Sequence, residues 1–304
     1  MTGGSNKIWI DALRNEERLP ESYATTVFYY VAPLAERISA LRVDLRRSII
    51  IGINGAQGSG KTTLALFLAN WLRHELGLSV ASLSLDDLYL SKHERRQLAE
   101  QQHPLLQTRG VPGTHDVELG MRLLTALTES GPKHVVVLPR FDKACDDRLE
   151  PSDARRVDAP VDVVLFEGWC VGANAQPDAD LDFPVNALEA EEDADGDWRK
   201  FVNEKLKDEY LALFERLDAL IMLRVPSFDK VLEWRELQEQ KLRTATAAGM
   251  TSAQLRRFVM HFERLTRHML EDMPGYADSV IDIDDSHRMV AATSRQWPFE
   301  LTGP

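Results

Sequence analysis

Residues 55–62, GAQGSGKT, combine three glycines with a lysine and a threonine in a spacing suited to phosphate. The segment fits the pattern G-x-x-x-x-G-K-[ST], in which glycines let successive backbone N–H groups approach a phosphate chain. In such a loop Lys61 is expected to contact the β- and γ-phosphates, and the Thr62 hydroxyl to bind Mg²⁺. We therefore predict a nucleoside triphosphate site. Its predicted nucleotide-binding residues are Gly55, Ala56, Gln57, Gly58, Ser59, Gly60, Lys61, Thr62 and Thr63.

Two acidic residues follow a second apolar run, in SLSLDDLYL. Asp86 and Asp87 lie 25 and 26 residues beyond Lys61. A carboxylate at the end of a strand near the phosphates can take the proton of an attacking hydroxyl. A turn or helix cap is the alternative, because Asp caps helices well. The phosphate loop upstream favours Asp86 as a general base.

A third acid ends the apolar run in VDVVLFEGWCVG. Glu167 stands where a carboxylate can orient the water around Mg²⁺ beside a phosphate loop. The alternative is a polar residue that simply leaves the sheet. We predict that Glu167 and Thr62 form the metal site.

The elements that must position these residues follow from the apolar runs of the chain. Short runs rich in Val, Ile and Leu that hardly alternate with polar residues are typical of strands buried on both faces of a parallel sheet. Helical segments separate them, which predicts an α/β fold with helices on both faces. Residues 1–47 read as helical. The predicted strands are 48–53, 79–85, 134–139, 161–166, 217–225 and 278–284.

Composition limits the partners of this 304-residue chain, whose formal net charge is −12. Such a charge repels nucleic acid and anionic membranes, so we expect neither as a partner. Neither a signal peptide nor an apolar run of about 20 residues is present, and the two cysteines show no metal-binding spacing, so we expect a cytoplasmic protein. Residues 177–197 hold nine acidic residues and no Lys or Arg, which favours a solvated loop over a metal or partner site.

Several segments together resemble one group of kinases. SLDDLY, RGVPGTHD (109–116), LPRFDKACDDR (138–148) and LFEGWCVG (165–172) accompany the phosphate loop. With it they are similar to the phosphoribulokinase, uridine kinase and pantothenate kinase superfamily. Within it the chain most resembles D-glycerate 3-kinases of the plant and fungal type and their bacterial relatives, from about residue 48 to 285.

This resemblance implies a P-loop NTPase three-layer sandwich with a helical lid. It implies an N-terminal helical extension over 1–47, a kinase domain over 48–304 and a lid at about 227–243. The implied reaction is ATP- and Mg²⁺-dependent transfer of the γ-phosphate to a hydroxyl of a small hydroxy acid, D-glycerate above all, with Asp86 as the base.

The resemblance also nominates residues on the acceptor side. Lys61, Asp86, Glu167 and a lid arginine, Arg235, would be the catalytic set, with Lys241 and Arg243 as lesser lid candidates. A guanidinium fork suits the carboxylate of glycerate, although an exposed surface arginine is the alternative for Arg109 and Arg140. His115 fits a structural role as well. The predicted substrate-binding residues are Asp87, Arg109, His115, Asp116, Arg140 and Lys143, with Asp142 in the same loop.

Two other functions stay open at this stage. One is a kinase of the same superfamily with a pantothenate-like, nucleoside or sugar-alcohol acceptor. The other is a regulatory NTPase in which the loop only controls a partner surface. The chain has no N-K-x-D guanine motif and no LSGGQ motif, which disfavours a GTPase switch and an ABC ATPase. Separate acidic and cationic motifs after successive strands favour an enzyme with a second small-molecule pocket.

Overall fold

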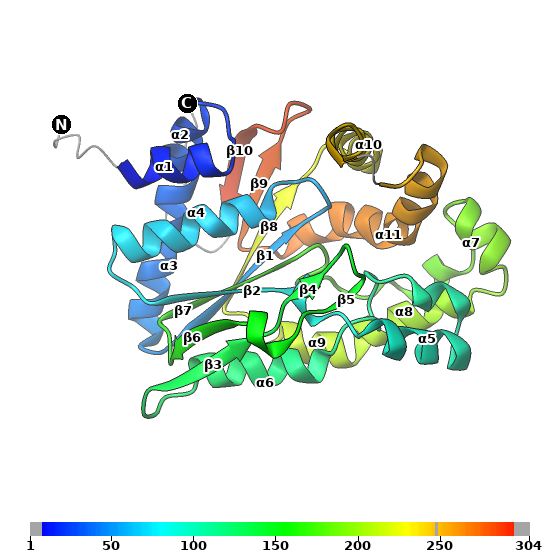
Figure 1. Ribbon diagram of the computed structural model, residues 1–304, viewed down its shortest axis with the longest axis horizontal. Coiled ribbons are helices and arrows are strands. Elements are labelled where there is room, and N and C mark those ends of the chain that lie inside the picture. The colour runs from blue at the N-terminus through cyan, green and yellow to red at the C-terminus, as the bar shows by residue number, and fades with distance from the viewer. Residues whose placement is uncertain (1–7, 247–248, 295–304) are drawn as a thin grey trace.

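The computed structural model describes residues 8–246 and 249–294, which form a sheet between two layers of helices (Figure 1). The sheet has six strands in the order β10-β9-β8-β1-β7-β2. Neighbouring strands run parallel, except for the antiparallel pair β9–β10. The strands are β1 (Ile49–Gly55), β2 (Val80–Ser84), β7 (Val163–Gly168), β8 (Ala219–Arg224), β9 (Ser279–Ile283) and β10 (Met289–Ser294). The predicted α/β class is confirmed.

The central strands lack a polar face because both sides of the sheet are covered. Along β7, Val163 and Leu165 enter one apolar cluster, whereas Val164 and Phe166 enter the cluster on the opposite face. Alternate side chains of a strand point to opposite faces, so both must be apolar when two helical layers pack on the sheet.

Helices from the start of the chain complete one face of this sheet. Leu34 and Ile38 are fully buried and share a core with Ile51 of β1. The indole of Trp9 donates a hydrogen bond of 2.8 Å to Glu75, just beyond α4. Residues 8–45 therefore pack into the same apolar core as one face of the sheet. Helices on this face include α1 (Ile8–Glu16), α2 (Tyr23–Thr26), η1 (Val27–Val31), α3 (Ala32–Leu45) and α4 (Lys61–His74).

Later helices such as α6 and α9 cover the opposite face, whereas Phe228, Val231 and Trp234 of α10 join the first cluster. The long helix α11 (Ser252–Asp272) contributes apolar side chains to both clusters. No helix within 8–246 and 249–294 is long and apolar enough to cross a membrane. The remaining helices are η2 (Leu85–Leu88), α5 (Lys92–Gln101), η3 (Pro104–Gln107), α6 (Val117–Thr128), η4 (Pro151–Asp153), η5 (Asp178–Leu181), α7 (Ala187–Glu192), α8 (Asp197–Lys207), α9 (Glu209–Phe214), α10 (Phe228–Thr246) and η6 (Met273–Gly275).

The prediction of a main-sheet strand at 134–139 is wrong. Residues 134–138 form β3 (His134–Leu138), which pairs antiparallel with β6 (Arg155–Ala159) outside the main sheet. Val135 and Val137 are exposed whereas Val136 and Leu138 are buried, so the strand is half-buried in spite of its apolar composition. A second small hairpin joins β4 (Phe141–Asp142) to β5 (Asp147–Arg148).

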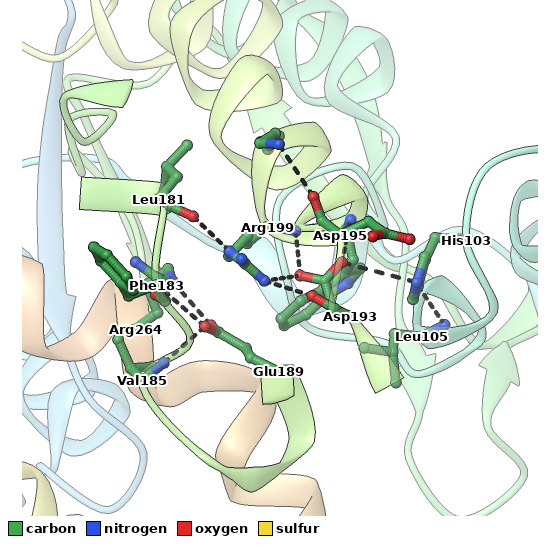
Figure 2. A network of polar contacts seen from close by, with 12 residues as sticks. His103, Leu105, Leu181, Phe183, Val185, Glu189, Asp193, Asp195, Arg199 and Arg264 are labelled. Atoms are coloured by element: carbon green, nitrogen blue, oxygen red, sulfur yellow. Dashed lines mark hydrogen bonds and ion pairs between the residues drawn. The ribbon is translucent and has the colours of Figure 1, made fainter. Parts of the chain in front are cut away.

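The prediction of a solvated loop for the acidic segment 177–197 holds only in part, because most of its acidic residues are exposed but two are buried. It contains η5 and α7, and the side chains of Glu189 and Asp193 are buried. Arg264 of α11 donates hydrogen bonds of 2.8 and 2.7 Å to Glu189, and Arg199 of α8 donates one of 2.9 Å to Asp193 (Figure 2). The prediction fails for these two residues because the arginines that pair with them lie outside the segment.

The Glu189–Arg264 pair gives a stability prediction. Glu189→Gln should lower the free energy of unfolding by about 3 to 5 kcal/mol, since it leaves the nine-tenths-buried guanidinium of Arg264 without a counter-charge. Urea unfolding followed by circular dichroism measures this change. Glu191→Gln, at an exposed position of the same helix, is the control and should change stability by less than about 0.5 kcal/mol. Equal effects of the two variants would contradict the prediction.

Candidate active site

The phosphate loop joins the central strand β1 to the N-terminus of α4. Gly58 and Gly60 have φ angles of 81° and 88°, in the left-handed region that glycine adopts without strain. A Cβ at Gly55 would lie 2.4 Å from the Oγ of Ser59 and 3.2 Å from the Cβ of Leu223, so a side chain here would crowd the loop. Lys61 is the first residue of α4, at the positive end of the helix. The loop has the local geometry that the motif predicts for anion binding.

Thr62 and Glu167 meet beside this loop, as expected for a metal site. The Thr62 hydroxyl donates a hydrogen bond of 3.1 Å to Oε1 of Glu167, which β7 brings next to β1. The second oxygen, Oε2, is buried and has no hydrogen-bond partner among the described residues. A buried carboxylate oxygen without a donor suits a cation.

The donor set also indicates which cation would fit. In the part of the chain that the structure describes, no cluster of three or more His, Cys, Asp or Glu residues could hold a metal. Mg²⁺ is usually held by one or two protein oxygens together with substrate phosphates and water. Thr62 and Glu167 therefore fit Mg²⁺ bound together with a nucleotide.

Asp86 lies at the end of β2, in η2, where two donors hold its carboxylate. The Tyr89 hydroxyl donates to Oδ1 at 2.8 Å, and the Lys143 ammonium donates to Oδ2 at 2.6 Å. Burial is the largest single influence and raises the pKa, but the charges of Lys143 and Lys61 and these hydrogen bonds outweigh it and lower the pKa of Asp86 to about 2. The carboxylate is therefore ionised at neutral pH, as a general base must be.

Aromatic packing fixes the position of Tyr89 behind Asp86. The Tyr89 ring stacks on His115 with centroids 4.6 Å apart and meets Phe141 edge-on at 5.1 Å. His115 contacts the Tyr210 hydroxyl at 2.5 Å and is almost fully buried. Burial lowers the pKa of His115 to about 3 although Asp86 opposes this, so the imidazole is neutral at physiological pH. The structure thus places His115 behind Tyr89, where it supports the base.

Asp87 supports the loop that carries Lys143. Its Oδ1 accepts a hydrogen bond of 3.1 Å from the backbone N–H of Phe141, at the start of the β4–β5 hairpin. Burial raises the pKa of Asp87 most, and the carboxylates of Asp86 and Glu167 add to the effect. On the same loop Asp146 is paired with Arg109, whose guanidinium also lies 5.6 Å from the Phe141 ring. The structure therefore brings Arg109, Asp86 and Lys143 together.

A cavity of about 620 Å³ opens beside this group. Four cationic and two anionic side chains line it, in a chain whose net charge is negative. The cavity is thus locally suited to an anion. Its charged lining residues are Arg109, Lys143, Arg235, Arg257, Asp146 and Glu192, and the others are Pro104, Leu105, Gln107, Thr108, Met250 and Phe258.

The helix α10 spans the predicted lid region and faces both the loop and the cavity. A Cβ at Gly58 would lie 3.5 Å from the Cβ of Trp234, so α10 packs directly against the phosphate loop. Arg235 lines the cavity, and burial lowers its pKa. The side chains of the lesser candidates, Lys241 and Arg243, lie outside what the structure describes.

Five nominated residues do not line this cavity: Asp87 and His115, described above, and Asp116, Asp142 and Arg140. Asp116 caps α6, accepting a hydrogen bond of 2.9 Å from the N–H of Leu119. Asp142 accepts one of 2.8 Å from the N–H of Ala144 within its own turn. Arg140 is exposed and lines a separate cavity of about 90 Å³. Asp116 and Asp142 thus hold local backbone in place through these hydrogen bonds. Arg140 lines a different cavity from Arg109 and Lys143.

Four of the residues at the site were not predicted from the sequence, and only two of them could have been. Tyr89 lies three residues after Asp86 and Asp146 lies in the loop of Lys143, so both could have been found by proximity. Arg257 and Glu192 come from elements far apart in the chain, and neither belongs to a motif that indicates a site. Only the packing of α7 on α11 brings them together.

A glycine-rich phosphate loop, an ionised aspartate and a cationic cavity at the carboxyl ends of parallel strands define a P-loop kinase that acts on small molecules.

Comparisons with known proteins support this class and specify it further. The chain is 34% identical over 229 residues to the uncharacterized kinase mug58 of Schizosaccharomyces pombe, covering 71% of the chain and 79% of that protein. It is 30% identical over 261 residues to the chloroplastic D-glycerate 3-kinase of Arabidopsis thaliana, covering 80% of the chain and about half (54%) of that protein. No protein-family model matches the chain.

A solved structure shares the fold. The D-glycerate 3-kinase of Cryptococcus neoformans superimposes with a TM-score of 0.72 at 24% sequence identity, over 87% of this chain and 99% of that one. The chain therefore belongs to the D-glycerate 3-kinase-like family of P-loop kinases. The predicted transfer of phosphate to an alcohol acceptor is confirmed at the level of this family.

Proposed function

We propose that this protein transfers the γ-phosphate of ATP to a hydroxyl of D-glycerate, with Mg²⁺ bound at Thr62 and Glu167. The observation that carries the proposal is the cationic cavity beside Asp86, because it offers an anionic acceptor a place next to a base. The names of the Arabidopsis and Cryptococcus relatives support D-glycerate as that acceptor.

The nucleotide would bind with its phosphates in the loop. Backbone N–H groups between Gly55 and Thr62 and the Lys61 ammonium would hold the β- and γ-phosphates. Bound Mg²⁺ would neutralise developing charge on these phosphates, and the uncoordinated Oε2 of Glu167 is available to its shell. A guanidinium in the cavity would pair with the acceptor carboxylate, since arginine binds carboxylates through two parallel hydrogen bonds.

The acceptor hydroxyl must come within hydrogen-bonding distance of Asp86, whose two oxygens each accept one hydrogen bond. Tyr89 is buried, whereas the Lys143 side chain is 60% exposed, so we infer that the acceptor hydroxyl approaches on the Lys143 side and takes its place at Oδ2. The hydroxyl proton then passes to Asp86 as the oxygen–phosphorus bond forms. The bond from the γ-phosphorus to the bridging oxygen breaks, and ADP leaves. The protein forms no covalent bond to the transferred group, so it catalyses the reaction by positioning the reactants and by electrostatic stabilisation.

Lys143 gives a prediction on pH dependence. Lys143→Met removes the strongest influence that lowers the pKa of Asp86, so burial should raise this pKa and the carboxylate should protonate at a higher pH. The wild-type kcat/KM should stay flat on the acid side down to about pH 4, whereas the variant should lose activity as the pH falls between about 6 and 4. A pH–rate profile measures this shift. If the pH–rate profiles of the wild type and of Lys143→Met coincide on the acid side, the prediction is contradicted.

An acceptor panel tests the proposed function. D-glycerate, L-glycerate, glycerol, pantothenate, uridine and ribitol are assayed separately for ADP production with ATP and Mg²⁺, and product NMR locates the new phosphate. The proposal expects the highest kcat/KM with D-glycerate. A better turnover of another acceptor would assign the protein to another kinase of the superfamily. Slow hydrolysis that no acceptor stimulates would instead favour the regulatory NTPase.

A further inference from the structure

Arg257 lines the cavity from α11 and was not among the predicted site residues. Its Nε and Nη2 donate hydrogen bonds of 3.0 and 2.6 Å to the two oxygens of Glu192. No partner for Nη1 lies within the part of the chain that the structure describes. Because a guanidinium carries five N–H donors, this pairing fixes the orientation of Arg257 and leaves donors for a ligand.

The residue that orients Arg257 is itself held in place. Glu192 ends α7, and Glu189 of the same helix is paired with Arg264, two turns beyond Arg257 on α11. Two Arg–Glu pairs thus tie α7 to α11, one facing the cavity and one buried. This arrangement restricts the motion of Arg257.

The next residue, Asp193, extends this anchoring to a second wall of the cavity. Its buried carboxylate accepts hydrogen bonds from the backbone N–H of Trp198 at 2.8 Å and from Arg199 at 2.9 Å. It also lies 3.9 Å from His103, which caps η3, and Pro104 and Leu105 of η3 line the cavity (Figure 2). The acidic segment therefore supports the cavity from both α11 and η3.

We propose that Arg257 binds the carboxylate of the acceptor together with Arg109, and that residues 177–197 form the element that positions it. This inference rests on the proposed function, which it deepens by assigning acceptor recognition. Glu192 is a positioning residue, because it acts through Arg257. Three of the nine acids in the segment, Glu189, Glu192 and Asp193, each pair with an arginine, and the pair of Glu192 lies at the cavity.

The test combines Arg257→Met with binding and rate measurements on the full chain. The dissociation constant for D-glycerate, measured by calorimetry with a non-hydrolysable ATP analogue, and the KM for D-glycerate should each rise about ten- to a hundredfold, as for loss of a charge-assisted hydrogen-bond pair. Affinity for the nucleotide should change less than about twofold. Discrimination between D-glycerate and glycerol, which lacks the carboxylate, should decrease by a similar factor.

Arg267→Met is the matched control. Arg267 lies on the same helix, is 47% exposed compared with 49% for Arg257, and pairs with Glu263 outside the cavity. The Arg267→Met variant should leave the dissociation constant and the KM for D-glycerate unchanged. Glu192→Gln should raise the KM for D-glycerate less than Arg257→Met does, with kcat unchanged, as expected for positioning. An Arg257→Met protein with wild-type melting temperature and wild-type affinity for D-glycerate would overturn the inference.

Failure of the proposed function gives a different result. If the wild type does not phosphorylate D-glycerate, the same variants are tested on the best acceptor of the panel. A loss of affinity for an anionic acceptor in Arg257→Met that Arg267→Met does not share would support the role of Arg257. A neutral best acceptor, or an anionic one that Arg257→Met binds normally, would overturn it.

Discussion

Replacing Lys61 with Ala should reduce kcat at least about a thousandfold. Lys61 begins α4 at the phosphate loop, where its ammonium would offset charge that grows on the transferred group, and removal of such a donor costs a large part of the catalysis. Affinity for ATP should also weaken, because the lysine would contact the bound phosphates. A coupled assay of ADP production and calorimetry with ATP and Mg²⁺ measure both effects.

Two controls isolate the phosphate contact in this experiment. Lys92→Ala removes an exposed lysine that likewise begins a helix, α5, and should leave turnover unchanged. Lys61 also lowers the pKa of Asp86, so the rates are compared at pH 8, where Asp86 is ionised in either protein. A Lys61→Ala enzyme with a kcat within tenfold of the wild-type value would contradict the proposal that the triphosphate binds at this loop.

The phosphate loop could be predicted because its chemistry is contiguous in the chain. Gly58 and Gly60 need left-handed φ angles, and the lysine and threonine follow directly, so eight residues carry the whole geometry. Asp86 and Glu167 could be found because each ends a strand, and the carboxyl ends of parallel strands meet at one edge of the sheet. The sheet places Glu167 within 3.1 Å of Thr62.

Features that depend on distant partners could not be predicted in this way. β3 has the composition of a buried strand, but its pairing with β6 leaves Val135 and Val137 exposed. The two buried carboxylates of segment 177–197, Asp193 and Glu189, are paired with Arg199 and Arg264, which lie on other helices. Packing also decides which cavity each arginine lines: Arg257 lines the cavity of about 620 Å³, whereas Arg140 lines a separate one.

Asp86→Asn should keep ATP binding and lower kcat at least about a hundredfold. The amide is nearly isosteric and can still accept a hydrogen bond from Tyr89, but it cannot take the proton of the acceptor hydroxyl. Single-turnover rates with saturating ATP and acceptor, together with the dissociation constant for ATP, separate chemistry from binding. A near-normal kcat in this variant would show that Asp86 is not the general base.

A double variant decides whether the acid limb of the Lys143→Met profile belongs to Asp86. Lys143 acts on the pH profile through the carboxylate of Asp86, so the effects of the two substitutions should not add. In Asp86→Asn/Lys143→Met the residual rate should lose its dependence on pH between about 4 and 6, because the group that titrates is gone. An acid limb that persists in the double variant would assign the titration to another residue, and Asp86 would then serve only to hold Lys143 in place.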